Sequence, residues 1–76
     1  METISKKAEL EKIFNLINEY VIFEIGFTIR TKTNDTLIIQ LEHITKGWDL
    51  RINGENKGLY SFQEIRQKLL SENLRD

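Results

Sequence analysis

His43 is the one histidine of the chain, and its imidazole would serve as a general base if a nucleophile or an orienting acid lay within hydrogen-bond reach. The alternating pattern around it places His43 on the same strand face as Ile25 and Leu50, which offer only hydrocarbon. We therefore interpret His43 as a partly buried structural histidine rather than as a catalytic group.

Two carboxylates, Glu24 and Glu42, fall on neighbouring predicted strands and could form an acid–base pair. The predicted register places Arg51 opposite Glu42, however, which favours an exposed cross-strand ion pair worth about 0.2–1 kcal/mol. Paired catalytic carboxylates also need a cleft that raises the pKa of one of them, and the pattern implies no cleft. The sequence therefore predicts a protein that is not an enzyme.

Cofactor and metal chemistry find little support in the residue types. The chain has no Cys, which removes thiolate catalysis and sulfur-ligated zinc, and one His cannot build a histidine-rich metal site. Gly54 and Gly58 lack the lysine and the following helix of a phosphate-binding loop, so they are interpreted as turn residues. We expect no cofactor and no metal. With 11 Lys and Arg against 12 Asp and Glu, electrostatic function must lie in local patches.

Two amphipathic helices are expected near the two ends of the chain. Residues 5–18 place apolar side chains at helical spacing, with Thr3 or Ser5 as the N-cap and Asn18 as the stop. A second helix is expected to begin at Phe62, because residues 61–64 match a capping box and are flanked by a hydrophobic staple. The first apolar stripe consists of Leu10, Ile13, Phe14 and Ile17, and the staple of Tyr60 and Ile65.

Between the helices the period changes to two, which predicts strands over residues 21–30, 36–42 and 48–52 and a short edge strand at 59–60. The predicted hairpin loops are residues 33–35 and the dipeptide Lys46-Gly47. These loops place Phe27 opposite Leu41 and His43 opposite Leu50, so that the apolar residues of all three strands share one face.

The fold class that follows is α+β, a single domain over residues 1–76 with the two-layer order α-β-β-β-α. A three-stranded antiparallel meander is expected to carry both helices on one face. The predicted core contains Phe14, Ile17, Phe23, Ile25, Phe27, Ile29, Ile39, Leu41, Trp48, Leu50, Ile52, Phe62, Ile65 and Leu69.

The second face of the sheet is left open in this arrangement and is a mixed surface of isoleucines and charges. Such a surface suits a protein partner, with the isoleucines as anchors and the charges setting orientation at the rim. An ordinary solvated sheet face would also look like this. The residues predicted to bind a partner are Ile22, Glu24, Arg30, Ile38, Glu42, Ile44 and Arg51.

Two nucleic-acid-binding families share features with the chain. The order α-β-β-β-α is that of the double-stranded-RNA-binding domain, but that family carries a lysine cluster where this chain has Ser61-Phe62-Gln63-Glu64. Residues 48–70 look like the arm-type DNA-binding domain of phage integrases, which place the exposed sheet face in the major groove. Here Arg30, Lys32 and Arg51 on that face are accompanied by Glu24, Glu42 and Asp49, which oppose phosphate.

In size and composition the chain resembles the anti-CRISPR proteins and other small phage inhibitors of host defence. It has 76 residues and no Cys, and its 11 Ile against 1 Val, with 7 Lys and 6 Asn, indicate an AT-rich coding sequence. The resemblance implies steric blocking of a host protein, such as a nuclease, in the bacterial cytoplasm. A nucleic-acid-binding module and a homodimeric housekeeping subunit are the alternatives. No membrane segment or signal peptide is expected.

Overall fold

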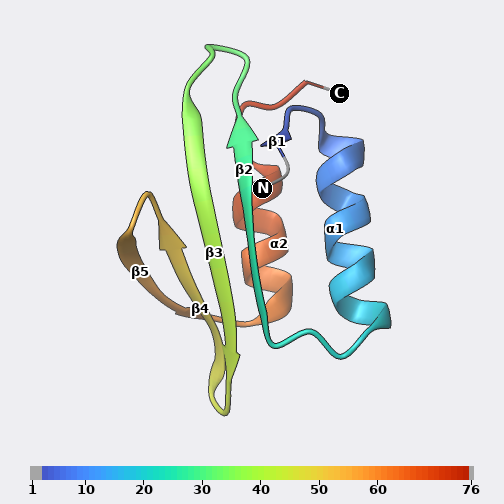
Figure 1. Ribbon diagram of the computed structural model, residues 1–76, viewed down its shortest axis with the longest axis vertical. Coiled ribbons are helices and arrows are strands. Elements are labelled where there is room, and N and C mark those ends of the chain that lie inside the picture. The colour runs from blue at the N-terminus through green and yellow to red at the C-terminus, as the bar shows by residue number, and fades with distance from the viewer. Residues whose placement is uncertain (1–2, 76) are drawn as a thin grey trace.

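A computed structural model describes residues 3–75 of the chain, and their order of elements confirms the α+β class (Figure 1). Both predicted helices and all three strands of the predicted meander are present, and the described residues form two further strands at the edges of the sheet. The elements are β1 (Thr3–Ile4), α1 (Lys7–Glu19), β2 (Glu24–Arg30), β3 (Thr36–Ile44), β4 (Gly47–Ile52), β5 (Glu55–Tyr60) and α2 (Phe62–Leu70).

The sheet follows the strand order β1-β2-β3-β4-β5, in which only β1 runs parallel to its neighbour. The predicted edge strand at 59–60 is present as part of β5, but β5 is longer than predicted and begins at Glu55. Asn53 and Gly54 have positive φ angles of 54° and 82°, as a tight two-residue hairpin turn requires, and so they connect β4 directly to β5.

The predicted register was wrong by two residues in both hairpins. Phe27 lies opposite Ile39 rather than Leu41, and Leu41 lies opposite Leu50. The connecting loops are residues 31–35 and the dipeptide Thr45-Lys46. Because side chains alternate with a period of two, a slip of two residues keeps each side chain on its predicted face.

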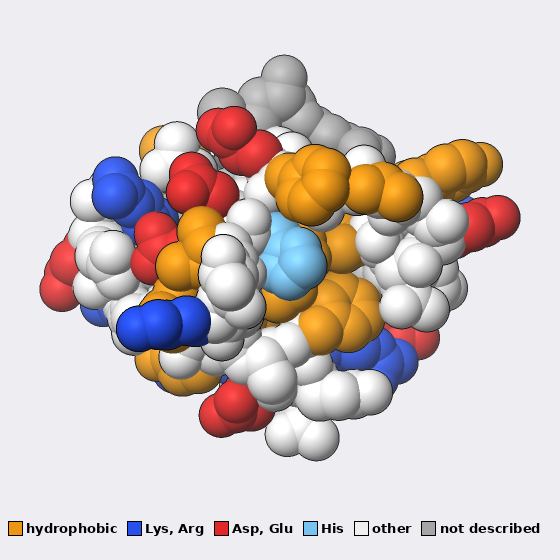
Figure 2. Space-filling model, turned by 90° about the horizontal axis from the view of Figure 1, so that it is seen from below, with side chains coloured by type: hydrophobic (Ala, Val, Ile, Leu, Met, Phe, Trp, Pro, Cys, Tyr) orange, Lys and Arg blue, Asp and Glu red, His pale blue; other side chains and the backbone are white. Residues whose placement is uncertain are grey.

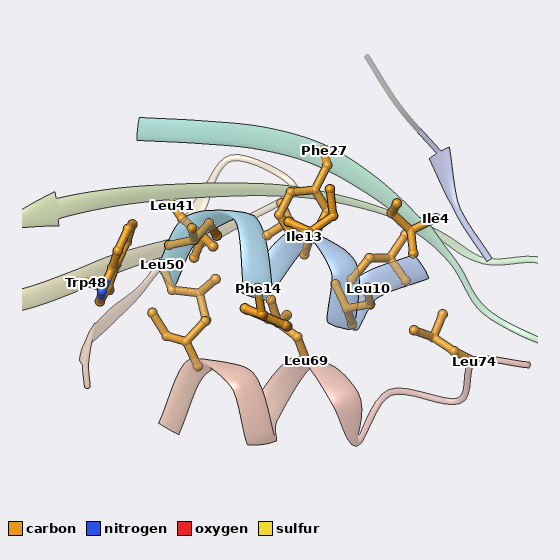
Figure 3. Packing of buried hydrophobic residues seen from close by; sticks show 14 residues of the cluster. Ile4, Leu10, Ile13, Phe14, Phe27, Leu41, Trp48, Leu50, Leu69 and Leu74 are labelled. Atoms are coloured by element: carbon orange, nitrogen blue, oxygen red, sulfur yellow. The ribbon is translucent and has the colours of Figure 1, made fainter. Parts of the chain in front are cut away.

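Both helices pack on the same face of the sheet, and the core fills the space between the two layers (Figures 1 and 3). Figure 3 shows Leu41, Trp48 and Leu50 reaching from the sheet toward Phe14 and Leu69 on the helices. The buried residues are Ile4, Leu10, Ile13, Phe14, Ile17, Phe27, Ile29, Ile39, Leu41, Trp48, Leu50, Ile65, Leu69 and Leu74. Ile25, Ile52 and Phe62 are partly buried against this cluster, but the prediction that Phe23 belongs to the core was wrong.

The start of α1 also differs from its prediction. The N-cap residue is Lys6 rather than Thr3 or Ser5, and its side chain makes no capping hydrogen bond. Thr3 belongs to β1. The main-chain amide of Ser5 donates to the Glu9 carboxylate at 3.3 Å. At the other end Asn18 lies within the helix, which continues to Glu19.

The N-terminus of α2 has the predicted capping box. The Glu64 amide donates to the Ser61 hydroxyl at 3.2 Å, and the Ser61 amide donates to the Glu64 carboxylate at 3.0 Å. Replacing Ser61 with Ala removes the acceptor for the Glu64 amide and is expected to cost about 1 kcal/mol of unfolding free energy. Thermal denaturation should show a melting temperature lower by about 4–8 °C, and an unchanged value would contradict this role of the cap.

The same capping box predicts a pH dependence of stability. The hydrogen bond from the Ser61 main-chain amide, followed by the bond with its hydroxyl, holds the pKa of Glu64 below its ordinary value of 4.5. A carboxyl whose pKa is lowered by folding stabilises the fold above its unfolded-state pKa, and this contribution is lost as the pH falls through the folded-state value. Denaturation from neutral pH to below pH 4.5 should therefore show a steeper acid loss for the wild type than for Glu64→Gln, which keeps the acceptor without the charge.

Candidate functional site

The open face of the sheet, on the side away from the helices, carries six of the seven predicted partner-binding residues. The apolar members are exposed as predicted, with 42% of Ile38 and 37% of Ile44 accessible to solvent. The charged members are exposed as well, and they are Glu24, Arg30, Glu42 and Arg51. They are spread along the strands, with Glu24, Glu42 and Ile44 near one end of the sheet and Arg30 near the other.

The seventh residue, Ile22, does not belong to this face. The strand β2 begins only at Glu24, so the alternation that the prediction extended back to Ile22 does not apply there. Ile22 instead lies in the connection after α1, where its side chain is partly buried against the core. The prediction that Ile22 lies on the open face was therefore wrong.

Three carboxylates form a line across the open face because Glu24, Glu42 and Asp49 are direct cross-strand neighbours on β2, β3 and β4. We call these three residues the acidic row. Arg51 lies opposite Gln40 and not Glu42, so the predicted Glu42–Arg51 ion pair was wrong. Arg51 is instead 3.8 Å from Asp49 on its own strand, measured from Nε to Oδ2. One guanidinium beside three carboxylates leaves this part of the face acidic.

A shallow hollow of about 250 Å³ lies beside the acidic row, where Gly26 contributes no side chain. Its lining includes Gln40 and Arg51 but no hydroxyl, imidazole or thiol that could act as a nucleophile. Within residues 3–75, no three His, Cys, Asp or Glu side chains are placed to hold a metal ion. The hollow therefore offers charge and hydrogen bonds to a ligand, and the carboxylates of the acidic row are its groups capable of acid–base chemistry.

His43 has a different environment from the predicted one. Its ring is exposed and lies flat between two aromatic rings, with centroid distances of 6.2 Å to Phe23 and 4.7 Å to Trp48 and interplanar angles of 13° and 19°. The stack continues inward, since Trp48 is 6.3 Å from Phe62, which meets Phe14 edge-on at 5.9 Å. An exposed pair of rings is thus anchored on the aromatic part of the core.

The end of the molecule around this stack exposes a cluster of large apolar side chains. Val21 is 84% exposed, Phe23 61% and Tyr20 60%, and we call these three residues together with His43 the aromatic end. Figure 2 looks directly at this end and shows the imidazole at its centre, bordered by hydrophobic side chains, with a group of acidic side chains alongside. Single exposed apolar residues are ordinary, but a contiguous group of them marks an interaction surface.

The sequence contains a signal for the aromatic end that the period-two interpretation overlooked. Residues 20–23 are apolar at four consecutive positions, so an alternating strand could bury only two of them. The main-chain amide of His43 donates to the carbonyl of Phe23 at 2.6 Å, which holds Phe23 beside the last residues of β3. A four-residue apolar run directly after a helix indicates an exposed apolar group in such a short chain.

No protein-family model, curated protein or solved structure matches the chain. None of the helices within residues 3–75 is long and apolar enough to cross a membrane. Function is therefore inferred from the chemistry of the surface.

Proposed function

We propose that this protein is a small, non-enzymatic protein-binding module that docks through the aromatic end and the adjoining part of the open face. The observation that carries the proposal is the ring of Phe23, which is 61% exposed although it is stacked on His43 and continuous with the core through Trp48. Exposing such a ring costs free energy that a partner would recover by covering it.

The aromatic end has the properties of an energetic centre of an interface. Aromatic side chains dominate interface hot spots because they bury a large area with few rotatable bonds. The ring of Phe23 lies against that of His43, and Trp48 is buried beneath them. Because these rings are already ordered in the free protein, less side-chain conformational entropy is lost when a partner binds. Ile44, the next residue in the sequence after His43, lies on the open face and adds apolar area at the margin of the aromatic end.

The acidic row lies at the same end of the sheet as this centre, on the open face, because Glu24 and Glu42 are the sequence neighbours of Phe23 and His43 and point to the opposite side of the strands. Carboxylates at the rim of an apolar centre favour a partner surface that carries Lys or Arg around an apolar patch. The same carboxylates repel phosphate, which disfavours a nucleic-acid backbone on this surface. The partner that fits this surface best is accordingly a protein.

The biological setting that we propose is that of a phage or mobile-element inhibitor, similar in kind to the anti-CRISPR proteins. Such a protein would act by covering a working surface of a host protein, such as a nuclease, and needs no catalytic residues of its own. The support for this setting is the chain's size, its composition and its exposed apolar end. A homodimer that buries the aromatic end of two copies is the competing arrangement.

Affinity capture from a low-GC bacterial lysate, with and without nuclease treatment, tests the proposal. We expect a protein partner that stays bound after nuclease treatment, because the recognition surface is apolar and acidic. A captured partner that is lost after nuclease treatment would instead support the nucleic-acid-binding alternative. Sedimentation of the purified protein over a range of concentrations distinguishes the homodimer, which would form without any lysate component.

A further inference from the structure

The end of the molecule opposite the aromatic end contains a second hollow, of about 300 Å³, and cations line it. It lies where β2 ends, beside the start of α1 and the C-terminal segment that follows α2 (Figure 1). Three of its lining residues carry a positive charge and the other three carry a hydroxyl or an amide. The lining residues are Ser5, Arg30, Thr31, Lys32, Asn34 and Arg75.

Main-chain hydrogen bonds fix the three chain segments that build this hollow. The Lys32 amide donates to the Asn73 carbonyl at 2.7 Å, and the Arg75 amide donates to the Ser5 carbonyl at 3.2 Å. The 31–35 loop is closed on itself by the Thr31 amide, which donates to the carbonyl of Asp35 at 2.9 Å. The three cationic side chains therefore extend from a constrained backbone, although they come from distant parts of the sequence.

No carboxylate from residues 3–75 lines the hollow, and within this range Arg30, Lys32 and Arg75 form no ion pair. Among the described residues, two carboxylates from the neighbouring segments accept hydrogen bonds from the protein itself. The Asp35 carboxylate accepts a hydrogen bond from the Thr33 hydroxyl at 2.9 Å, and the Glu9 carboxylate accepts one from the Ser5 amide at 3.3 Å. Three positive charges around one concave site repel one another, and a bound anion would relieve that repulsion.

We propose that this hollow binds a phosphate group in its dianionic form, as inorganic phosphate or a phosphate monoester. Arg30 and Arg75 each offer a planar fork of N–H donors that matches two phosphate oxygens, and Lys32 adds a compact positive charge. The Ser5 hydroxyl and the Asn34 amide are further donors. Three cations at one site match a dianion better than the single charge of a phosphodiester. The site is independent of the aromatic end and does not rest on the proposed function.

The test is a titration of the isotope-labelled protein with inorganic phosphate at pH 7.5 and constant ionic strength, followed by two-dimensional NMR. We expect saturable shifts of the amide signals of Ser5, of residues 31–34 and of Arg75, and none at His43. Arg75→Gln should weaken phosphate binding about tenfold, as expected for the loss of one charge-assisted contact. Arg30→Gln should do the same, whereas the control Arg51→Gln should leave the affinity within about twofold.

Several results would overturn the proposal. Shifts that grow without saturating, or an equal loss of affinity in Arg51→Gln, would show that phosphate only screens the surface charge. An unchanged affinity in both Arg30→Gln and Arg75→Gln would remove the hollow as the site. An oligonucleotide without terminal phosphates that binds here more tightly than inorganic phosphate would replace the monoester with a nucleic-acid backbone. All three arginines are exposed, so each variant is expected to fold. The amide signals far from the substituted residue should match those of the wild type, and this match reports that the variant is folded.

Discussion

Replacing Phe27 with Ala is expected to destabilise the protein by about 3–5 kcal/mol, the cost typical of removing a buried aromatic ring. Phe27 is 1% exposed and packs between the two layers. A domain of 76 residues has a total unfolding free energy of roughly 4–11 kcal/mol, so this loss is a large part of the whole. Chemical denaturation should show a much lower midpoint, or a variant that is largely unfolded at room temperature.

The matched control is Phe23→Ala, four residues earlier and in the same phase of the pattern. Phe23 is 61% exposed, lies outside the buried cluster and is stacked on the exposed ring of His43, so the variant should lose about 1 kcal/mol or less. Equal destabilisation by the two substitutions would mean that Phe23 is a core residue, and it would remove the aromatic end as an exposed surface.

The second large effect is expected at Gly47, the first residue of β4. Its φ of +144° is one that residues with a side chain rarely adopt, and an added Cβ would lie 2.9 Å from the main-chain oxygen of Tyr60. Because that contact is with backbone of the neighbouring strand, it cannot be relieved by rotating a side chain. Strain and overlap together should make Gly47→Ala cost about 2–4 kcal/mol, measured by chemical denaturation.

Gly54→Ala provides the comparison for Gly47→Ala. Gly54 also has a positive φ, +82°, but no atom lies within 4 Å of an added Cβ. Only the conformational strain of about 1–2 kcal/mol should therefore remain. If the two variants lose the same stability, the close approach of β4 and β5 at Gly47 does not restrict that position.

Much of the fold could be predicted from the sequence because apolar residues recur at helical or strand spacing in most elements, and because a capping box marks the start of α2. The stripe from Leu10 to Ile17 and the capping box at Ser61 depend on residues close together in the chain. The two-residue strand β1 is too short to show any period. The Asn53-Gly54 turn was recognisable from its residue types, and recognising it would have extended the edge strand to Glu55.

The candidate site was less accessible to sequence reasoning because it depends on how far the helices reach. Phe23 and Phe27 are the same residue type in the same phase, and only the tertiary packing distinguishes the exposed ring from the buried one. The predicted pairing of Glu42 with Arg51 failed for a related reason. The face to which each strand residue points follows from the alternating sequence pattern, but the strand register depends on which residues form the loops. A register slip of two residues therefore changes which charged residues lie opposite each other, while the apolar residues stay on the core face.

The most direct test of the proposed function compares two substitutions in one capture experiment from nuclease-treated lysate. Phe23→Asp places a charge on the aromatic end, and Ile38→Asp places the same charge at an exposed position of the open face, on β3 and nearer to Arg30 than to the aromatic end. Both variants should fold, because both positions are exposed. We predict that Ile38→Asp retains the protein partner of the wild type and that Phe23→Asp weakens its binding by about thirtyfold or more, as for an interface hot spot. Retention by folded Phe23→Asp would contradict docking through the aromatic end, and loss by Ile38→Asp alone would place the interface on the open face.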